Sequence, residues 1–383
     1  MQDILTDKEL AREFPLTRKF SYFAGASTGI IPERAIAAAN GFLQRYRDTN
    51  LAFDAEAIKM MGHLRDDIAK LIGASKGEIA LVPNTSVGIN IIAAGFPWQD
   101  GDEVLVGTRE FPANTYPWTN LQNRGVNIRW IEMTTGEITS EMVEKALTDR
   151  TRLLTISAVQ FADGYRADLA TIADTCHKRG VKIIVDGIQA VGALRIKSDD
   201  WNLDAFSSGG QKHMLSPCGS GFLQIATSLM EKLNPAYDGW LSHFIAAEDF
   251  QDLLKHDLPP APDAQRFEVG TPAYGSLWGM DASVQLLLEL GAENIEIHNI
   301  GISNIFCEEA KKIPGIEIAS DRTEGHKSQI VSIRVPKPQV THKKLAEQNI
   351  IVSLREGCLR FAFHIYNSIN QVERAIAVLR KVV

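Results

Sequence analysis

The sequence predicts an α/β protein built on a mostly parallel sheet, with a smaller α+β domain toward its C-terminal end. Between about residues 55 and 200, short β-rich runs alternate with amphipathic helical stretches, as in parallel sheets covered by helices. The pattern changes near residue 257, where the proline-rich stretch HDLPPAPDAQ has the composition of a linker. The length of 383 residues favours roughly two domains.

The first half of the chain supplies the elements of the sheet in order. Residues 55–72 carry apolar side chains at helical spacing and predict a helix with one buried face. Short, apolar, β-branched runs predict strands at 78–82, 103–106, 126–131, 152–157 and 181–185. Between the last two, residues 168–179 predict a helix that ends at Gly180, because glycine commonly terminates helices.

The second half predicts a compact α+β domain. Helices are expected at 280–290, 343–349 and 369–382, and strands at 316–319, 329–335, 350–354 and 359–363. We therefore expect three parts in the chain. They are an N-terminal segment at 1–20 that packs with the small domain, a large domain at 21–258 and a small domain at 259–383.

Composition and charge narrow the functional class. With 45% hydrophobic and 23% charged residues, the composition is that of a globular enzyme and excludes disordered or fibrous architectures. The net charge of −7 disfavours nucleic acid or an anionic membrane surface as the main partner. The first 20 residues lack the apolar core of a signal peptide, and no apolar stretch approaches the ~18 residues of a membrane span. A cytoplasmic protein that binds neither nucleic acid nor a membrane is expected.

The cysteines are scattered and suggest neither disulfides nor a metal site. None of them forms a C-x-x-C pair or a cysteine–histidine cluster, so reduced thiols are expected. The four are Cys176, Cys218, Cys307 and Cys358.

Asp186 and Lys212 are the residues that most suggest chemistry. Asp186 ends the run VKIIVD, and the carboxyl ends of parallel strands are where such sheets bind ligands. Lys212 lies in the glycine-rich segment SSGGQKHMLSPCGSG, which permits close approach of the backbone to a bound group. Taken singly, Asp186 is better explained as a cap or turn residue and Lys212 as a solvated charge. Together they match the pair that pyridoxal phosphate (PLP) needs, an imine-forming lysine and a carboxylate facing the pyridinium nitrogen.

A phosphate site is expected at residues 84–88, NTSVG, which follow a predicted strand and open a helix. Free amides at a helix N-terminus and two hydroxyl groups make a suitable anion site. An ordinary helix cap explains the same residues equally well.

Seven segments of the chain occur in an order that matches a known family. They are YFAGASTG, PNTSVGIN, REFPANTYPW, DGIQAVGAL, GGQKHMLSPCGSGF, RFEVGTPAYG and LRFAFHIYNS. Together, along nearly the whole chain, they resemble class V aminotransferase-fold PLP enzymes, in the subgroup with cysteine desulfurases, cysteine and cystine C–S lyases and isopenicillin N epimerase. The resemblance implies the type I PLP-dependent transferase fold, with a seven-stranded, mostly parallel sheet in the large domain.

The resemblance also implies a role for each residue that would meet the cofactor ring. Lys212 would be the catalytic residue, holding PLP as an imine and then moving protons at the substrate Cα. Asp186 would pair with the pyridinium nitrogen, and Gln189 would hydrogen-bond the ring hydroxyl. Phe111 occupies the position at which the family stacks an aromatic or imidazole ring on the cofactor.

Further positions would bind the cofactor phosphate and the substrate. Thr85 and Ser86 would bind the phosphate, with Gln211 where desulfurases carry a phosphate-binding histidine. Thr271 would reach the phosphate of the neighbouring subunit, so a homodimer is expected. Arg360 would clamp the α-carboxylate of a small amino-acid substrate, a task suited to a bidentate guanidinium.

Several positions depart from the desulfurases of this family. Desulfurases place their persulfide-forming cysteine on a mobile segment ahead of the carboxylate-binding arginine, but here the two arginines of LREGCLR lie too close for one. Cys358 is therefore expected to be a packed thiol. Phe111 replaces a histidine and Phe161 an asparagine, which weakens the case for sulfur transfer and implies a more apolar pocket. His213 is interpreted as a residue that packs the turn, with an acid–base role as the alternative.

The sequence thus predicts a PLP-dependent enzyme acting on a small α-amino acid through an external aldimine and a quinonoid. Aminotransfer and C–S lyase-type β-elimination rank first, epimerisation second and persulfide-forming desulfuration third. A nicotinamide-dependent dehydrogenase would fit the parallel sheet, but no strand is followed by G-x-G-x-x-G. A non-catalytic PLP-binding regulator is the other alternative, although no appended DNA-binding helical module is found.

Overall fold

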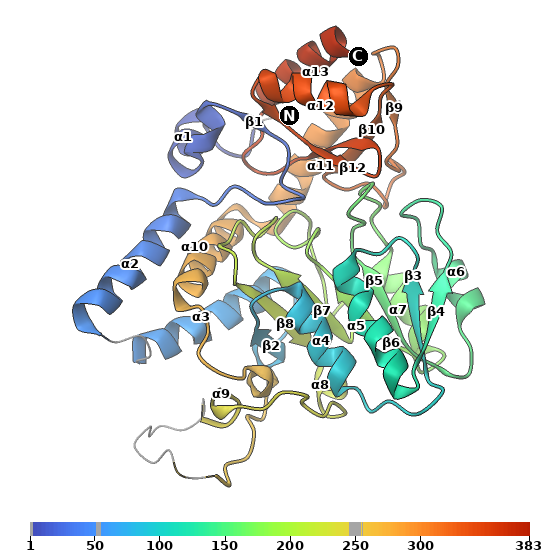
Figure 1. The fold of residues 1–383 in the computed structure, drawn as a ribbon. Coiled ribbons are helices and arrows are strands. Elements are labelled where there is room, and N and C mark those ends of the chain that lie inside the picture. The colour runs from blue at the N-terminus through green and yellow to red at the C-terminus, as the bar shows by residue number, and fades with distance from the viewer. Residues whose placement is uncertain (1–2, 51–54, 245–253, 255) are drawn as a thin grey trace.

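The large sheet organises most of the molecule (Figure 1). The computed structural model describes residues 3–50, 55–244, 254 and 256–383. In these residues, seven strands lie in the order β2-β8-β7-β6-β5-β3-β4, parallel from β7 to β4 and antiparallel where β8 joins β7 and β2. The expected seven-stranded, mostly parallel sheet is confirmed. The strands are β2 (Ile79–Leu81), β3 (Glu103–Gly107), β4 (Asn127–Ile131), β5 (Thr151–Ser157), β6 (Lys182–Asp186), β7 (Ala205–Gly209) and β8 (Gly221–Ile225).

Both faces of this sheet are buried under helices. In β3, Leu105 packs into one apolar cluster, while Val104 and Val106 pack into another, because successive strand side chains point to opposite faces. The first cluster includes residues of α3, α7 and α10, and the second includes residues of α4 and α5. These helices are α3 (Ala55–Ile72), α4 (Thr85–Gly95), α5 (Tyr116–Thr119), α7 (Leu169–His177) and α10 (Tyr274–Leu290). The others of the first part are α1 (Asp7–Glu13), α2 (Glu33–Thr49), α6 (Ser140–Ala146), α8 (Thr227–Met230) and α9 (Trp240–Phe244).

A second, antiparallel sheet lies in the C-terminal part, with strand order β12-β13-β10-β9. A separate apolar cluster joins it to three helices. The two-residue strand β1 pairs in parallel with β11 and so connects the N-terminal part of the chain to this region. The elements are β1 (Ser21–Tyr22), α11 (Ala292–Ala310), β9 (Glu317–Ile318), β10 (Ile330–Arg334), α12 (Pro338–Glu347), β11 (Ile350–Ile351), β12 (Ser353–Arg355), β13 (Cys358–Ala362) and α13 (Ile369–Val382).

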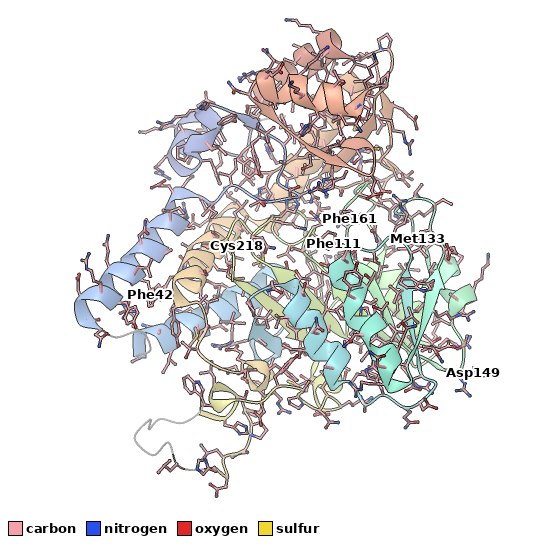
Figure 2. All side chains as sticks on the ribbon, viewed as in Figure 1. Phe42, Phe111, Met133, Asp149, Phe161 and Cys218 are labelled. Atoms are coloured by element: carbon pink, nitrogen blue, oxygen red, sulfur yellow. The ribbon has the colours of Figure 1, made fainter. Side chains whose placement is uncertain are left out.

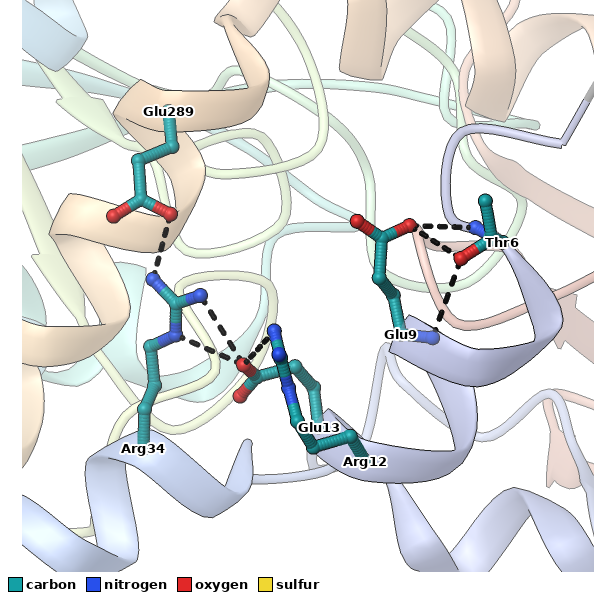
Figure 3. A network of polar contacts seen from close by, with 6 residues as sticks. All are labelled: Thr6, Glu9, Arg12, Glu13, Arg34 and Glu289. Carbon is teal, nitrogen blue, oxygen red and sulfur yellow. Dashed lines mark hydrogen bonds and ion pairs between the residues drawn. The ribbon is translucent and has the colours of Figure 1, made fainter.

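Charged side chains fasten the N-terminal helix α1 to the body of the molecule (Figure 3). Thr6 and Glu9 form a capping box, in which each side chain accepts a hydrogen bond from the other residue's backbone N–H. Arg34 of α2 donates to Glu13 of α1 at 3.1 Å and to Glu289 of α10 at 2.7 Å. One guanidinium therefore links α1, α2 and α10.

Most expected elements lie within a few residues of the observed ones, one expected strand is divided, and helices α2 and α11 were not expected. The expected strand 350–354 is two short strands, because β11 pairs with β1 and β12 pairs with β13. Helix α11 was not expected, since its many isoleucine and asparagine residues have low helix propensity. It is held instead by burial of Ile295, Ile302 and Phe306.

The domain boundaries expected at residues 20 and 258 stay a prediction. The helix that follows the second boundary, α10, packs on α2 and α3. In the described residues, no helix is both long enough and apolar enough to cross a membrane.

Candidate active site

Polar side chains meet where the parallel strands of the large sheet end. Ser157 at the end of β5, Asp186 at the end of β6 and Ser207 in β7 lie side by side in register, and all three are buried. Thr85, at the start of α4, accepts a hydrogen bond from the Gly209 backbone N–H at 2.8 Å. The carboxyl edge of the sheet, where such sheets bind ligands, is therefore lined by an acid and several hydroxyl groups.

Asp186 and Lys212 influence each other at this edge. Burial raises the pKa of Asp186 to about 6, against the opposing effects of a hydrogen bond from the Ile188 N–H and of the Lys212 ammonium. Burial also lowers the pKa of Lys212 to about 8, and the Asp186 carboxylate limits that fall. Because an amine attacks only in its neutral form, Lys212 is a better nucleophile near neutral pH than an exposed lysine.

Arg360 brings a buried positive charge from β13 to the same site. Its side chain donates to the Phe161 carbonyl and, at 2.8 Å, to Ser27 Oγ. Its Nε is buried and has no hydrogen-bond partner in the described part of the chain. Burial and, to a smaller extent, the charge of Arg355 lower the pKa of Arg360 to about 10. Since no carboxylate is among the groups that shift this pKa, the guanidinium is suited to an anionic ligand.

Arg355 and Ser27 were not singled out as site residues from the sequence. Arg355 Nη2 lies 3.5 Å from Ser27 Oγ, the atom that Arg360 also contacts. Ser27 Oγ is in turn 2.9 Å from Ser353 Oγ. Two guanidinium groups therefore converge on one hydroxyl oxygen, an arrangement that accommodates a carboxylate.

The start of α4 carries the two hydroxyl residues expected at a phosphate. Asn84 caps the helix with its side chain, and the N–H groups of the first turn have no partners within the helix. Thr85 is buried, whereas Ser86 is exposed. Gly88 permits close packing on β7, because a Cβ there would lie 2.2 Å from Ser207 Oγ. This helix end can therefore bind an anion near the strand edge.

Phe111 and Phe161 form an apolar wall beside Lys212. The two phenyl rings pack edge to face with their centroids 5.2 Å apart. Both residues are labelled in Figure 2. The Nζ atom of Lys212 lies 5.4 Å from the centroid of the Phe111 ring. Phe111 is 40% exposed, so part of its ring is free to meet a ligand.

The other residues expected to bind the cofactor, Gln189, Gln211 and Thr271, differ in burial and in their contacts. Gln189 is buried, with its amide nitrogen donating to the Ala26 carbonyl at 3.0 Å. Gln211 directly precedes Lys212, and its carbonyl accepts a hydrogen bond from the Gly29 N–H at 2.9 Å. Thr271 is exposed and lines a separate, largely apolar pocket. Gln189 thus contacts His213, the residue after Lys212, and Gln211 is the residue before it, whereas Lys212 is not among the residues that line the pocket of Thr271.

Glu110 is a buried acid at this site that the sequence did not single out. Its carboxylate accepts hydrogen bonds from Asn114 at 3.0 Å, from the Ser157 N–H at 2.9 Å and from Gln160 at 2.8 Å. Burial raises the pKa of Glu110, and its charge in turn raises the pKa of Asp186. Since Ser157 and Gln160 lie about 50 residues away in the sequence, no local pattern predicts these contacts.

A family model described as aminotransferase class-V matches residues 21–375. The chain belongs to the aminotransferase class-V family. This is a family of PLP-dependent enzymes, so the family, enzyme class and cofactor expected from the sequence are confirmed.

Relatives of this class-V aminotransferase family member carry several names. It is 27% identical over 368 residues to the uncharacterized aminotransferase YcbU of Bacillus subtilis strain 168, covering 95% of this chain and 94% of that protein. It is 28% identical over 319 residues to a probable cysteine desulfurase of Methanothermobacter thermautotrophicus, covering 82% of this chain and 78% of that protein.

Solved structures confirm the fold of this class-V chain. A mutant of C-DES with glycine covalently linked to the PLP cofactor has a TM-score of 0.88 at 23% identity, covering 97% of this chain and 99% of that one. The cysteine desulfurase CsdA from Escherichia coli has a TM-score of 0.85 at 20% identity, covering 98% and 97%.

The class-V site has the groups that PLP requires. A buried amine, a buried carboxylate, an aromatic face and an anion-binding helix end lie at one edge of the sheet. Nε of the buried Arg360 guanidinium has no hydrogen-bond partner among the described residues. Within the described ranges, no group of three or more His, Cys, Asp or Glu side chains could hold a metal ion.

Proposed function

We propose that this class-V enzyme acts on a small α-amino acid by aminotransfer or by C–S lyase-type β-elimination, with Lys212 as its catalytic residue. One observation carries the proposal: Lys212 is a buried amine whose pKa is lowered to about 8, and the charges of both the Asp186 carboxylate and the Arg360 guanidinium act on it. When bound, PLP supplies an electron sink that acidifies the Cα hydrogen of the attached amino acid.

The residues around Lys212 would hold the cofactor ring. Asp186 is buried where its carboxylate can keep a pyridine nitrogen protonated, and a pKa raised toward 6 means that it shares a proton readily. Gln189 has an amide N–H left for the ring hydroxyl, since only one of its two is used by Ala26. Phe111 would cover one face of the ring.

The phosphate would lie at the start of α4. Thr85 and Ser86 offer hydroxyl groups and free N–H groups there, and Gln211 is adjacent to the lysine. Thr271 would reach the phosphate of the neighbouring subunit. Its exposure supports that role, which makes a homodimer part of the proposal.

The substrate carboxylate would bind at Arg360. The guanidinium is held by the Phe161 carbonyl and Ser27 Oγ, which leaves N–H groups including the buried Nε for a ligand. Arg355, converging on the same serine, adds a second positive charge. A bidentate carboxylate would relieve the repulsion between the two arginines and fix the Cα hydrogen relative to Lys212.

Lys212 would then move the proton at Cα. Once free, its amine is neutral in a substantial fraction of molecules at pH 7 to 8, because its pKa is near 8. The phenyl rings of Phe111 and Phe161 carry no titratable group and keep water from one side of the site. Lysine is therefore the acid–base group of this arrangement.

Two further reactions share the same first step and rank lower, epimerisation before desulfuration. Cys358 lies on strand β13, where burial raises the pKa of its thiol, and only Glu356 and Gly357 separate β13 from β12. A thiol with a raised pKa on a tight hairpin is a poor carrier of sulfur. A non-catalytic PLP-binding regulator is the alternative from another class.

Product analysis tests the proposal. The PLP-loaded protein is incubated with single α-amino acids, and 2-oxo acid, ammonia, sulfide and enantiomeric excess are measured. We expect a 2-oxo acid in both cases. Elimination also releases ammonia and the sulfur leaving group as a thiol or persulfide, whereas aminotransfer releases neither and passes the amino group to an added second 2-oxo acid. Racemised amino acid as the only product would favour epimerisation, and no turnover of any amino acid would favour the regulator.

A further inference from the structure

His213 and Gln189 form a buried pair beside Lys212 whose hydrogen bonding fixes the orientation of the Gln189 amide. Gln189 Nε2 lies 3.0 Å from the Ala26 carbonyl oxygen, and Gln189 Oε1 lies 3.1 Å from His213 Nε2. A carbonyl oxygen only accepts, so the end of the amide that faces Ala26 must be its NH₂ group. The oxygen end therefore faces His213.

This orientation also assigns the proton on His213. Because Gln189 Oε1 can only accept, His213 Nε2 must carry the hydrogen. Gln329 Nε2 lies 3.2 Å from the same ring nitrogen and donates one of its two hydrogens to the Gln189 backbone carbonyl at 2.6 Å. Gln189 Oε1 is the contact that offers His213 Nε2 an acceptor, and we assign the ring hydrogen to Nε2 on that basis. The second nitrogen, His213 Nδ1, is buried with no partner among the residues that the structure describes.

The His213 ring is held in place and stays neutral. It stacks on His364 with centroids 5.5 Å apart and planes 7° from parallel, and His364 Nε2 donates to the His213 carbonyl at 2.9 Å. Burial lowers the pKa of His213 well below its usual range and that of His364 to about 3. A fully buried imidazole that remains neutral at physiological pH is a fixed donor and does not shuttle protons.

We propose that His213 is a positioning residue that acts through Gln189, holding the amide oxygen so that the second amide N–H is kept for the ring hydroxyl of the cofactor. This inference rests on the proposed function, in which Gln189 meets that hydroxyl. It replaces both interpretations of His213 from the sequence, turn packing and acid–base catalysis, with a specific task.

The proposal has a spectroscopic consequence in the PLP-loaded protein. A donor to the ring oxygen stabilises its anionic form and so lowers the pH at which the neighbouring Lys212 nitrogen gives up its proton. Loss of the donor should therefore raise the pH midpoint of the visible absorbance change. Because a hydrogen bond to a charged group is stronger than one between neutral groups, we expect its loss to shift the midpoint by about one pH unit, a tenfold change in proton affinity.

The test compares the pH midpoint of this band in four variants of the PLP-loaded protein. His213→Leu removes the donor and should raise the midpoint, whereas His213→Gln, which restores an N–H near the position of Nε2, should return it to the wild-type value. His298→Leu removes another buried histidine, one that donates a hydrogen bond to the Asn367 carbonyl, and should leave the midpoint unchanged. His213→Asn, whose shorter side chain does not reach Gln189, is the substitute for the leucine variant if that protein does not fold.

A double mutant separates action through Gln189 from a general effect of the substitution. Gln189→Leu alone should raise the midpoint, and adding His213→Leu should shift it no further, because the two residues act as one unit. An unchanged midpoint in His213→Leu, or additive shifts in the double mutant, would overturn the inference. A wild-type protein that acquires no visible band with PLP would overturn the proposed function itself, so the two failures are distinguishable.

Discussion

At the scale of single residues, the buried amine of Lys212 predicts how fast the enzyme takes up its cofactor. Only the neutral amine attacks the PLP aldehyde, and the fraction of neutral amine rises as the pH passes the pKa, which burial lowers to about 8. The rate at which cofactor-free protein gains its visible band should therefore rise with pH, with its midpoint near 8, and level off above that. Stopped-flow absorbance measures this rate, and a midpoint near the ordinary lysine value of ~10.4 would contradict the account.

A variant of Asp186 tests whether its carboxylate acts on the Lys212 amine in the same experiment. Its negative charge raises the pKa of Lys212, so Asp186→Asn should move the midpoint of cofactor uptake to lower pH. An upward shift in this variant would show that the two groups do not interact as the geometry requires.

Arg360 predicts a loss that depends on the substrate carboxylate. Arg360→Lys keeps a charge but loses the planar fork, and we expect kcat/KM for an amino acid to fall about 10- to 100-fold, the effect of one charge-assisted hydrogen bond. Reaction of the PLP-loaded protein with the corresponding amine, which has no carboxylate, should be nearly unaffected. Arg334→Lys on the neighbouring strand β10, an exposed residue paired with Glu317, serves as the control. Equal losses for the acid and the amine would remove the assigned role.

At the scale of elements, a buried ion pair fastens the segment that carries Thr271 to the sheet. Arg65 of α3 and Glu268 are both buried and joined at 2.7 Å, and Glu268 also accepts from the Leu81 N–H of β2 at 2.9 Å. Arg65→Met should cost about 3–5 kcal/mol in the free energy of unfolding, because it leaves a buried carboxylate unpaired.

The double variant Arg65→Met, Glu268→Leu should recover part of that stability, since no unpaired charge then remains. Recovery should be incomplete, because the Leu81 N–H loses its acceptor. Urea unfolding of the two proteins measures the difference. A double variant less stable than Arg65→Met alone would mean that the pair contributes in another way.

Among the elements, strands could be predicted from the sequence, whereas contacts between distant parts of the chain could not. Strands such as β6 and the residues at their ends, including Asp186, follow from local hydrophobic runs and from the geometry of parallel sheets. The contacts of Ser27 with Arg360 and of Glu110 with Ser157 join distant parts of the chain, and no local pattern encodes them. Helix α11 could not be predicted either, because tertiary packing stabilises a segment whose residues have low helix propensity.

At the scale of the whole molecule, the proposed homodimer can be tested by subunit complementation. Thr271→Ala should weaken PLP binding about 10- to 100-fold if its hydroxyl meets the phosphate of the neighbouring subunit. Lys212→Ala cannot form the imine. A mixed dimer of these two variants contains one site with both residues intact, so it should regain a PLP site of wild-type affinity that neither parent has.

Sedimentation identifies the dimer, and absorbance titration measures the recovered sites. A monomer with full PLP occupancy, or mixed dimers without a recovered site, would contradict the role of Thr271. Either result would mean that each subunit binds PLP with its own residues alone.

We expect Lys212 to be the one lysine of the chain that holds the cofactor as an imine. Reduction of the PLP-loaded protein with borohydride converts the imine to a stable secondary amine, and peptide mass spectrometry then locates it. We expect one phosphopyridoxyl group per chain, on Lys212, and none in the Lys212→Ala protein. A label on another lysine, or no label in the wild-type protein, would contradict it.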